Sequence, residues 1–182
     1  MKNINEILKK LIPPADYQHR NGFSNESIIL NLDESEKKEV EKQLISMLEL
    51  NDDDLIGETL VIMKSISALP NLRIRLDLAK SPASRILWAS YINELKGRDE
   101  EMIKIALLEF EKITEKYTRI GIFHCLSRFQ DSRINEKIRK FINHEDYLTA
   151  YNARTSLGLD PKEIIERERS KNKRKWWEFC KK

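Results

Sequence analysis

The spacing of the apolar residues constrains this chain most, because from about residue 36 onward they recur three and four positions apart. This spacing puts apolar side chains on one face of a helix, whereas a strand needs a period of two. The pattern predicts an all-α fold with eight amphipathic segments. They are Glu36–Leu50, Leu55–Ile66, Leu72–Ala79, Ala83–Leu95, Glu100–Ile113, Lys116–Phe129, Arg133–Ile142 and Asp146–Leu157.

Prolines, glycines and small polar residues separate these segments. Leu69–Pro70 is expected to end the second segment, because proline disfavours helical geometry in the residue before it. Ser81–Pro82 has the form of an N-cap followed by proline at the first helical position. Gly97 is expected to end the helix that starts there.

Aspartates follow the second helix of the last three pairs at Asp99, Asp131 and Asp160, which are 32 and 29 residues apart. A period of this size indicates stacked helical hairpins. The segment 153–161, ARTSLGLDP, resembles the end of a HEAT-type repeat, in which small residues and Leu-Gly precede Asp-Pro. Asp131-Ser132-Arg133 is similar to the start of such a repeat, whereas the first two pairs lack both features.

The resemblance covers about residues 35–160 and implies a right-handed α-solenoid of about four antiparallel helix pairs. Solenoids of this family usually grip another macromolecule on a concave inner surface and perform no chemistry. The expected organisation is an N-terminal helix and polar capping arm (1–34), HEAT-like repeats (35–160) and a basic, tryptophan-containing C-terminal helix or tail (161–182). Asp33 and Glu36 have capping-box spacing for the first long helix.

Charge is distributed unevenly, although the whole chain carries only +3. Residues 33–58 sum to −7 and residues 166–182 to +5. Such a layout is suited to steering a partner. The alternative is that charged helices simply keep solvated faces.

Motifs for catalysis or cofactor binding do not occur in the sequence: it has no Gly-rich phosphate loop, nucleophile elbow or paired metal ligands. His124 and Cys125 are adjacent, so on a helix they point about 100° apart and cannot act as a nucleophile–base pair. Cys125 is interpreted as a core thiol, and Asp52-Asp53-Asp54 as a helix cap. We therefore expect a non-enzymatic protein without catalytic, cofactor-binding or metal-binding residues.

Aromatic residues and arginines dominate binding hot spots, so those of the second helices and the tail are candidate partner-binding residues. The candidates are Arg85, Trp88, Arg119, Tyr147, Tyr151, Arg154, Arg174, Trp176 and Trp177. Between Ile165 and Trp176 lie ten residues with no apolar side chain, which no solenoid face can bury. The tail is therefore interpreted in two ways. It is a basic arm that contacts nucleic-acid phosphates or the acidic surface of a partner, or its aromatic side chains fold back over the last repeat.

The expected function is that of a monomeric, cytoplasmic protein-binding module, since no apolar run is long enough for membrane insertion. The chain resembles small bacterial HEAT-like immunity proteins, which implies that it clasps and blocks a toxin or effector domain. The alternative is nucleic-acid binding, as in HEAT-like DNA glycosylases, through the inner-helix arginines and the basic tail. A lyase-like role in phycobilin attachment rests on fold analogy alone. Exposed acids on the concave face would favour a protein partner, whereas a continuous positive face would favour nucleic acid.

Overall fold

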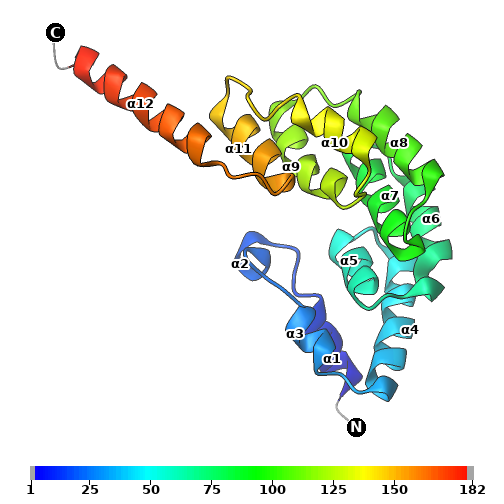
Figure 1. The fold of residues 1–182 in the computed structure, drawn as a ribbon. Coiled ribbons are helices and arrows are strands. Elements are labelled where there is room, and N and C mark those ends of the chain that lie inside the picture. Colours follow the sequence, from blue (N-terminus) through cyan, green and yellow to red (C-terminus); the bar gives the residue numbers. More distant parts are fainter. Residues whose placement is uncertain (1–2, 180–182) are drawn as a thin grey trace.

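The computed structural model describes the backbone of residues 3–179 and the side chains of residues 3–171 (Figure 1). Within this range the chain is helical and forms no strand, so the predicted all-α class is confirmed. The helices are α1 (Ile4–Leu11), α2 (Tyr17–Arg20), α3 (Glu26–Leu30), α4 (Glu34–Leu50), α5 (Asp54–Ile62), a short 3-10 helix (Ile66–Ala68), α6 (Leu69–Leu78), α7 (Pro82–Lys96), α8 (Glu100–Phe110), α9 (Lys116–Ser127), α10 (Ser132–Arg139), α11 (Tyr147–Ser156) and α12 (Lys162–Phe179). No helix among the described residues is both long and apolar enough to cross a membrane.

Side-chain caps define where most of these helices begin. Asp33 and Glu36 form the expected capping box at the start of α4: an Asp33 carboxylate oxygen accepts from Glu36 N at 2.8 Å, and a Glu36 carboxylate oxygen accepts from Asp33 N at 3.1 Å. Ser81 caps α7 ahead of a proline, as predicted. Gly97 ends that helix with φ +75°, a left-handed conformation that costs glycine little.

The role predicted for Leu69–Pro70 is wrong, because these residues open a helix instead of ending one. Helix α5 ends at Ile62, and Lys64 then takes a left-handed conformation with φ +57° before the 3-10 helix. Helix α6 begins at Leu69 with Pro70 in its first turn. Proline is tolerated there because backbone N–H groups of the first turn have no intrahelical partner.

Other helix bounds differ from the predicted ones mainly at the C-terminal ends. Helices α8, α9 and α10 stop two or three residues early, while apolar residues such as Ile113 and Phe129 in the following turns are still buried. The polar capping arm contains a short helix, α2, which Asp16 caps by accepting from His19 N. Apolar periodicity therefore marks burial more closely than it marks helix ends.

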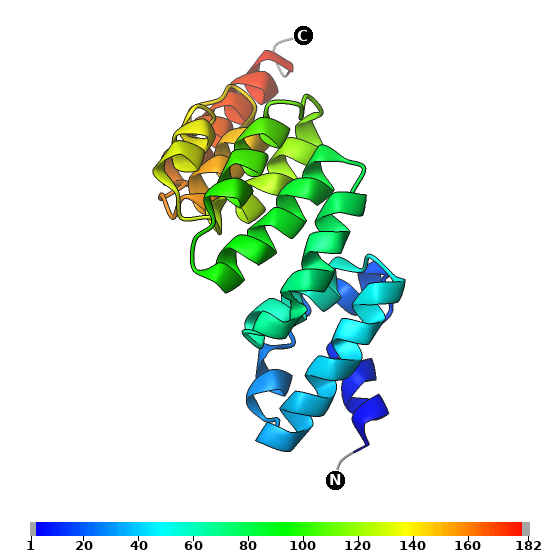
Figure 2. The same cartoon turned by 90° about the vertical axis from the view of Figure 1, so that its right-hand side faces the viewer.

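The helices after α3 contact one another in the order of the chain. Helix α5 packs on α7, α7 on α9 and α9 on α11, whereas α4 contacts α6 and α8 contacts α10. Figure 1 shows a curved body with α5, α9 and α11 on the inner side of the curve and α6 and α8 on the outer side. Figure 2 shows that the two ends of the chain lie at opposite ends of this elongated body.

The two terminal parts attach to the body in different ways. Ile7 and Leu11 of α1 are buried in the same apolar cluster as Val40 and Leu44 of α4, so the N-terminal arm shares the core. Helix α12 packs on α11 near its start, where Ile164 is buried, and then leaves the body (Figure 1).

Candidate functional site

Two of the three inner-helix arginines proposed as a shared surface bind their own chain. Arg85 donates from Nη1 to the Leu76 carbonyl at 3.2 Å and from Nε to the Glu109 carboxylate at 3.0 Å. Arg119 donates from Nη2 to the Ile113 carbonyl at 2.9 Å. Both carbonyls lie at or just after the end of the preceding helix, where backbone C=O groups lack an intrahelical partner.

Arg154 makes the same kind of contact one helix pair later. Its Nε donates to the Ile142 carbonyl at 3.0 Å, and its other nitrogens donate to the Asp160 carbonyl at 3.2 Å and to side-chain oxygens of Asn143 and Glu163 at 2.9 Å each. The structure therefore places one arginine in each of α7, α9 and α11 as a link to the end of the preceding helix. It does not bring Arg85, Arg119 and Arg154 together into one basic surface.

A fourth arginine, Arg128 of α9, joins three inner helices. Its Nη1 lies 3.3 Å from a carboxylate oxygen of Glu58 on α5, and its Nε donates to Glu94 on α7 at 2.9 Å. Its guanidinium lies 5.0 Å from the centre of the Tyr91 ring. The Arg128 side chain is 17% exposed, whereas Glu58 and Glu94 are 42% and 43% exposed. The cation is therefore shielded while both of its acidic partners face solvent.

Burial affects two ionisable neighbours of this cluster. Burial raises the pKa of the Tyr91 hydroxyl above its usual range, and the Glu58 carboxylate adds to the effect. Burial also raises the pKa of the Cys125 thiol to about 11, against the opposing effect of Arg128. Both groups therefore keep their protons at neutral pH, and Cys125 is partly buried and packs against the core.

Acidic side chains predominate where these helices face solvent. Asp54, with its side chain 63% exposed, stands one turn before Glu58 on α5. We call Asp54, Glu58, Glu94 and Arg128 the inner-face cluster. Helices α4, α6 and α8 pack on the other side of α5 and α7. Three carboxylates against one shielded guanidinium make this part of the surface acidic.

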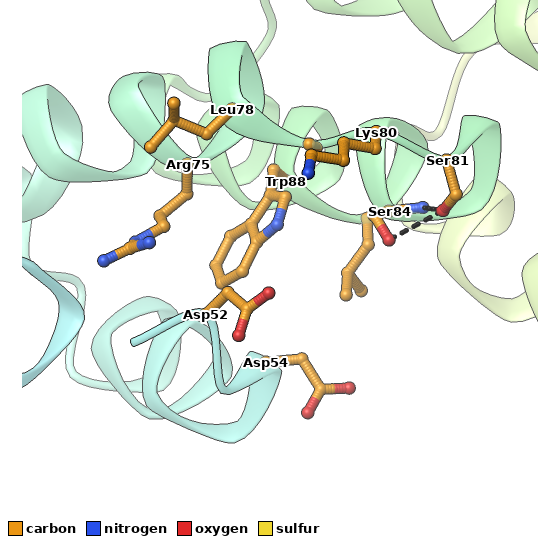
Figure 3. Close-up of a pocket in the computed structure, with 10 residues that line it drawn as sticks. Asp52, Asp54, Arg75, Leu78, Lys80, Ser81, Ser84 and Trp88 are labelled. Atoms are coloured by element: carbon orange, nitrogen blue, oxygen red, sulfur yellow. Dashed lines mark hydrogen bonds between the residues drawn. The ribbon is translucent and has the colours of Figure 1, made fainter. Parts of the chain in front are cut away.

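A pocket of about 530 Å³ opens beside this cluster, between the start of α5, the end of α6 and the start of α7 (Figure 3). Trp88, 3% exposed overall, supplies one wall, and Asp52, which precedes α5, lies beside its ring. Asp54, the first residue of α5, also lines the pocket, but its carboxylate points away from Trp88. Lys80 and Ser81 line the side of the pocket nearer the start of α7. Trp88 is thus the one candidate from the second helices that borders a pocket of this size.

Tyr147 and Tyr151, half-buried on α11, contact each other with their ring centres 5.7 Å apart. An ion pair between Lys116 and Asp146, at 2.7 Å, joins the starts of α9 and α11. The Lys116 ammonium also lies 5.2 Å from the ring centre of Tyr117, which is 67% exposed. We call Tyr117, Tyr147, Leu148 and Tyr151 the tyrosine patch; the exposed fraction of Leu148 is 41%.

The tyrosine patch and the inner-face cluster lie on the same side of α9. Tyr117 and Arg128 are 11 residues apart, which is close to three full turns, so their side chains project in nearly the same direction. Gly121 and His124, which are exposed, lie between them on that side. Tyr117 of the tyrosine patch therefore shares one side of α9 with the acidic cluster.

The tail candidates Arg174, Trp176 and Trp177 lie within the backbone range of α12, but their side chains lie outside the described residues. Sequence reasoning missed Asp54, Glu58 and Glu94 as surface residues. The −7 charge of residues 33–58 was the available signal. Which helix face becomes the inner one depends on how α5, α7 and α9 pack, and the spacing of residues in one helix does not specify that.

Among the described residues, no three His, Cys, Asp or Glu side chains are grouped so that they could hold a metal ion. No protein-family model matches the chain, and comparisons with curated proteins and with solved structures give no match either.

Proposed function

We propose that the chain is a HEAT-like α-solenoid that binds a basic protein on its inner face and performs no catalysis itself. This is the behaviour expected of an immunity protein that clasps and blocks a toxin or effector domain. The contacts among α4 to α11 support the solenoid arrangement, because helices in this range pack on the next helix or the next but one along the chain. One observation carries the choice of partner: the inner-face carboxylates are exposed, whereas the inner-helix arginines are engaged within the chain.

Electrostatics favours a basic protein over a nucleic acid at this face. Nucleic-acid binding needs lysines and arginines that neutralise the phosphates. Exposed carboxylates instead repel the phosphates. Arg128 is neutralised by Glu58 and Glu94, and Asp54 stands one turn away. Complementary charge speeds the encounter with a basic partner and suppresses binding of acidic ones.

The tyrosine patch supplies the apolar part of the proposed interface. Tyrosine is enriched at binding hot spots because its large ring is rigid and its hydroxyl can form a hydrogen bond. Tyr117 extends into solvent, while Tyr147 and Tyr151 support each other by ring contact. A partner that spans the face would meet acidic groups on α5 and α7 and aromatic groups on α9 and α11.

Site-specific photo-crosslinking tests this proposal. A photoreactive phenylalanine analogue replaces Tyr117 on the inner side or, as a matched control, Leu108 on α8; the native residues are 67% and 66% exposed. In lysate of the native cell we expect a discrete, nuclease-resistant protein adduct from position 117 and not from position 108. A nuclease-sensitive adduct, or equal adducts from both positions, would contradict the proposal.

Helix α12 favours nucleic-acid binding as a second candidate function. It leaves the body as a helix, and Arg169 and Lys171 on it are exposed (Figure 1). Residues 166–182 carry a net charge of +5. Deleting residues 171–182 separates the two functions: binding of a DNA or RNA duplex with steep salt dependence should vanish if the tail binds phosphates, whereas the position-117 adduct should persist.

A further inference from the structure

We propose that the pocket between α5, α6 and α7 receives an arginine or lysine side chain of the bound protein. This inference rests on the proposed function, because it assigns a basic partner residue to a specific place beside the inner face. The pocket volume of about 530 Å³ exceeds what one side chain fills, so part of the partner's backbone enters with it.

Apolar groups in the pocket suit the aliphatic stem of such a side chain. Leu87 and Trp88 lie on neighbouring positions of α7, and Leu78 comes from the end of α6. Arginine and lysine bury their methylene stems on apolar surface while the charged head stays among polar groups. A cation that reaches the face of the Trp88 ring is also stabilised by the negative charge of that face.

Two carboxylates at the start of α5 are placed to receive the charged head. Asp53, between them in sequence, is occupied: it caps α5 and accepts two hydrogen bonds from Arg20, at 2.7 Å and 2.5 Å. Asp52 and Asp54 both line the pocket: Asp52 lies beside the Trp88 ring, whereas the Asp54 carboxylate points away from that ring (Figure 3). Arg20 Nη1 approaches Asp54 to 3.9 Å, which is beyond hydrogen-bond distance.

The two cations that line the pocket do not occupy this position. Arg75 donates from Nε to the Leu48 carbonyl at 2.6 Å, and its guanidinium turns away from Trp88 (Figure 3). Lys80 is exposed and lies on the wall opposite Asp52 and Asp54. It repels an incoming cation from that side, so the partner's charged head is directed toward α5.

The test uses two small probes that have nearly the same shape but different charge. Nα-acetyl-arginine amide carries the guanidinium, and Nα-acetyl-citrulline amide carries a neutral urea in its place. Binding is followed by NMR through the indole N–H signal of Trp88, which is assigned with Trp88→Phe. We expect the arginine probe to shift this signal saturably and to bind at least about tenfold more tightly than the citrulline probe.

Matched charge variants locate the binding. Asp52→Asn/Asp54→Asn should weaken the arginine probe about fivefold, whereas Lys80→Gln should strengthen it about twofold. Glu26→Gln/Glu145→Gln removes two exposed carboxylates outside the pocket lining and should leave the affinity unchanged. Circular dichroism confirms that each variant is folded.

Equal affinity for the two probes, or equal weakening by both double variants, would overturn the proposal. The photo-crosslinking result at position 117 keeps the two ideas distinct. A position-117 adduct together with no arginine selectivity would leave the proposed function standing and reject the pocket assignment. Arginine selectivity without that adduct would support the pocket and reject the inner-face clasp.

Discussion

The guanidinium of Arg128 lies 5.0 Å from the centre of the Tyr91 ring, between the carboxylates of Glu58 and Glu94. This arrangement joins α5, α7 and α9 at one point. Because only the arginine is shielded from solvent, the group holds the inner helices together and still presents negative charge. Structural support and the proposed recognition of a basic partner therefore involve the same side chains.

Replacing Arg128 by methionine should lower the free energy of unfolding by about 1–2 kcal/mol, because a shielded cation–π contact and two ion pairs are lost. The effect is limited because Glu58 and Glu94 are partly exposed and become hydrated. Urea unfolding followed by circular dichroism measures it. Arg139→Met, at an exposed position of α10, should change stability by less than about 0.5 kcal/mol; equal effects would show that the Arg128 contacts contribute little.

Replacing Gly57 by alanine should destabilise the protein by about 1–3 kcal/mol through overpacking. A Cβ at this position would lie 2.6 Å from the Trp88 ring and 2.8 Å from the Tyr91 ring, and both rings are buried. Gly121, helical and exposed with open space at its Cβ position, is the control. Gly121→Ala should stabilise by about 0.5–1 kcal/mol because alanine favours the helix. Thermal and urea unfolding of the two variants should move in opposite directions.

Stability should depend on acid pH through Asp53. The hydrogen bonds from Arg20 lower the pKa of this carboxyl below its usual range, against the effect of burial. A lowered pKa in the folded state means that the stabilisation is present above the unfolded pKa and is lost as pH falls through the folded one. Asp53→Asn keeps an N-cap residue, so it removes mainly the ion pair.

We therefore expect Asp53→Asn to cost about 1 kcal/mol at pH 7 and progressively less below about pH 4. A double-mutant cycle with Arg20→Met measures the coupling directly. A coupling free energy that stays constant from neutral to acid pH would contradict the assignment.

Cys125 should react slowly with alkylating reagents. Burial raises the pKa of its thiol to about 11, so the thiolate fraction near pH 8 is about a hundredfold lower than for an ordinary thiol. In a Cys180→Ser background the iodoacetamide reaction reports on Cys125 alone. The folded protein should react at least that much more slowly than the same protein in denaturant; similar rates in the two states would place the thiol at the surface.

The sequence was sufficient to predict the helical class and most helix starts. Asp33, Ser81 and Asp99 act as N-caps because their side chains bond to backbone N–H groups a few residues away, and such local contacts follow from spacing. Helix ends were harder, since buried residues such as Phe129 continue the apolar pattern into a turn. The role of Pro70 was misjudged because a proline is compatible with the end of one helix and the start of the next.

The candidate site was less predictable than the helices. Arg85 and Arg154 are long side chains at helical positions, and their spacing does not tell whether they extend to solvent or to a carbonyl of the preceding helix. Trp88 was selected for its residue type, but its place at a pocket follows from three helices that meet there. Contacts between different helices decided both outcomes.

The contact between Glu58 and Arg128 joins residues 70 positions apart in a chain whose helices otherwise pack largely on their sequence neighbours. In such an array, fraying from one end can advance one helix at a time. This contact links α5 directly to α9, so α5 cannot detach without releasing a side chain of α9. We therefore expect this contact to couple the unfolding of α5 to that of α9.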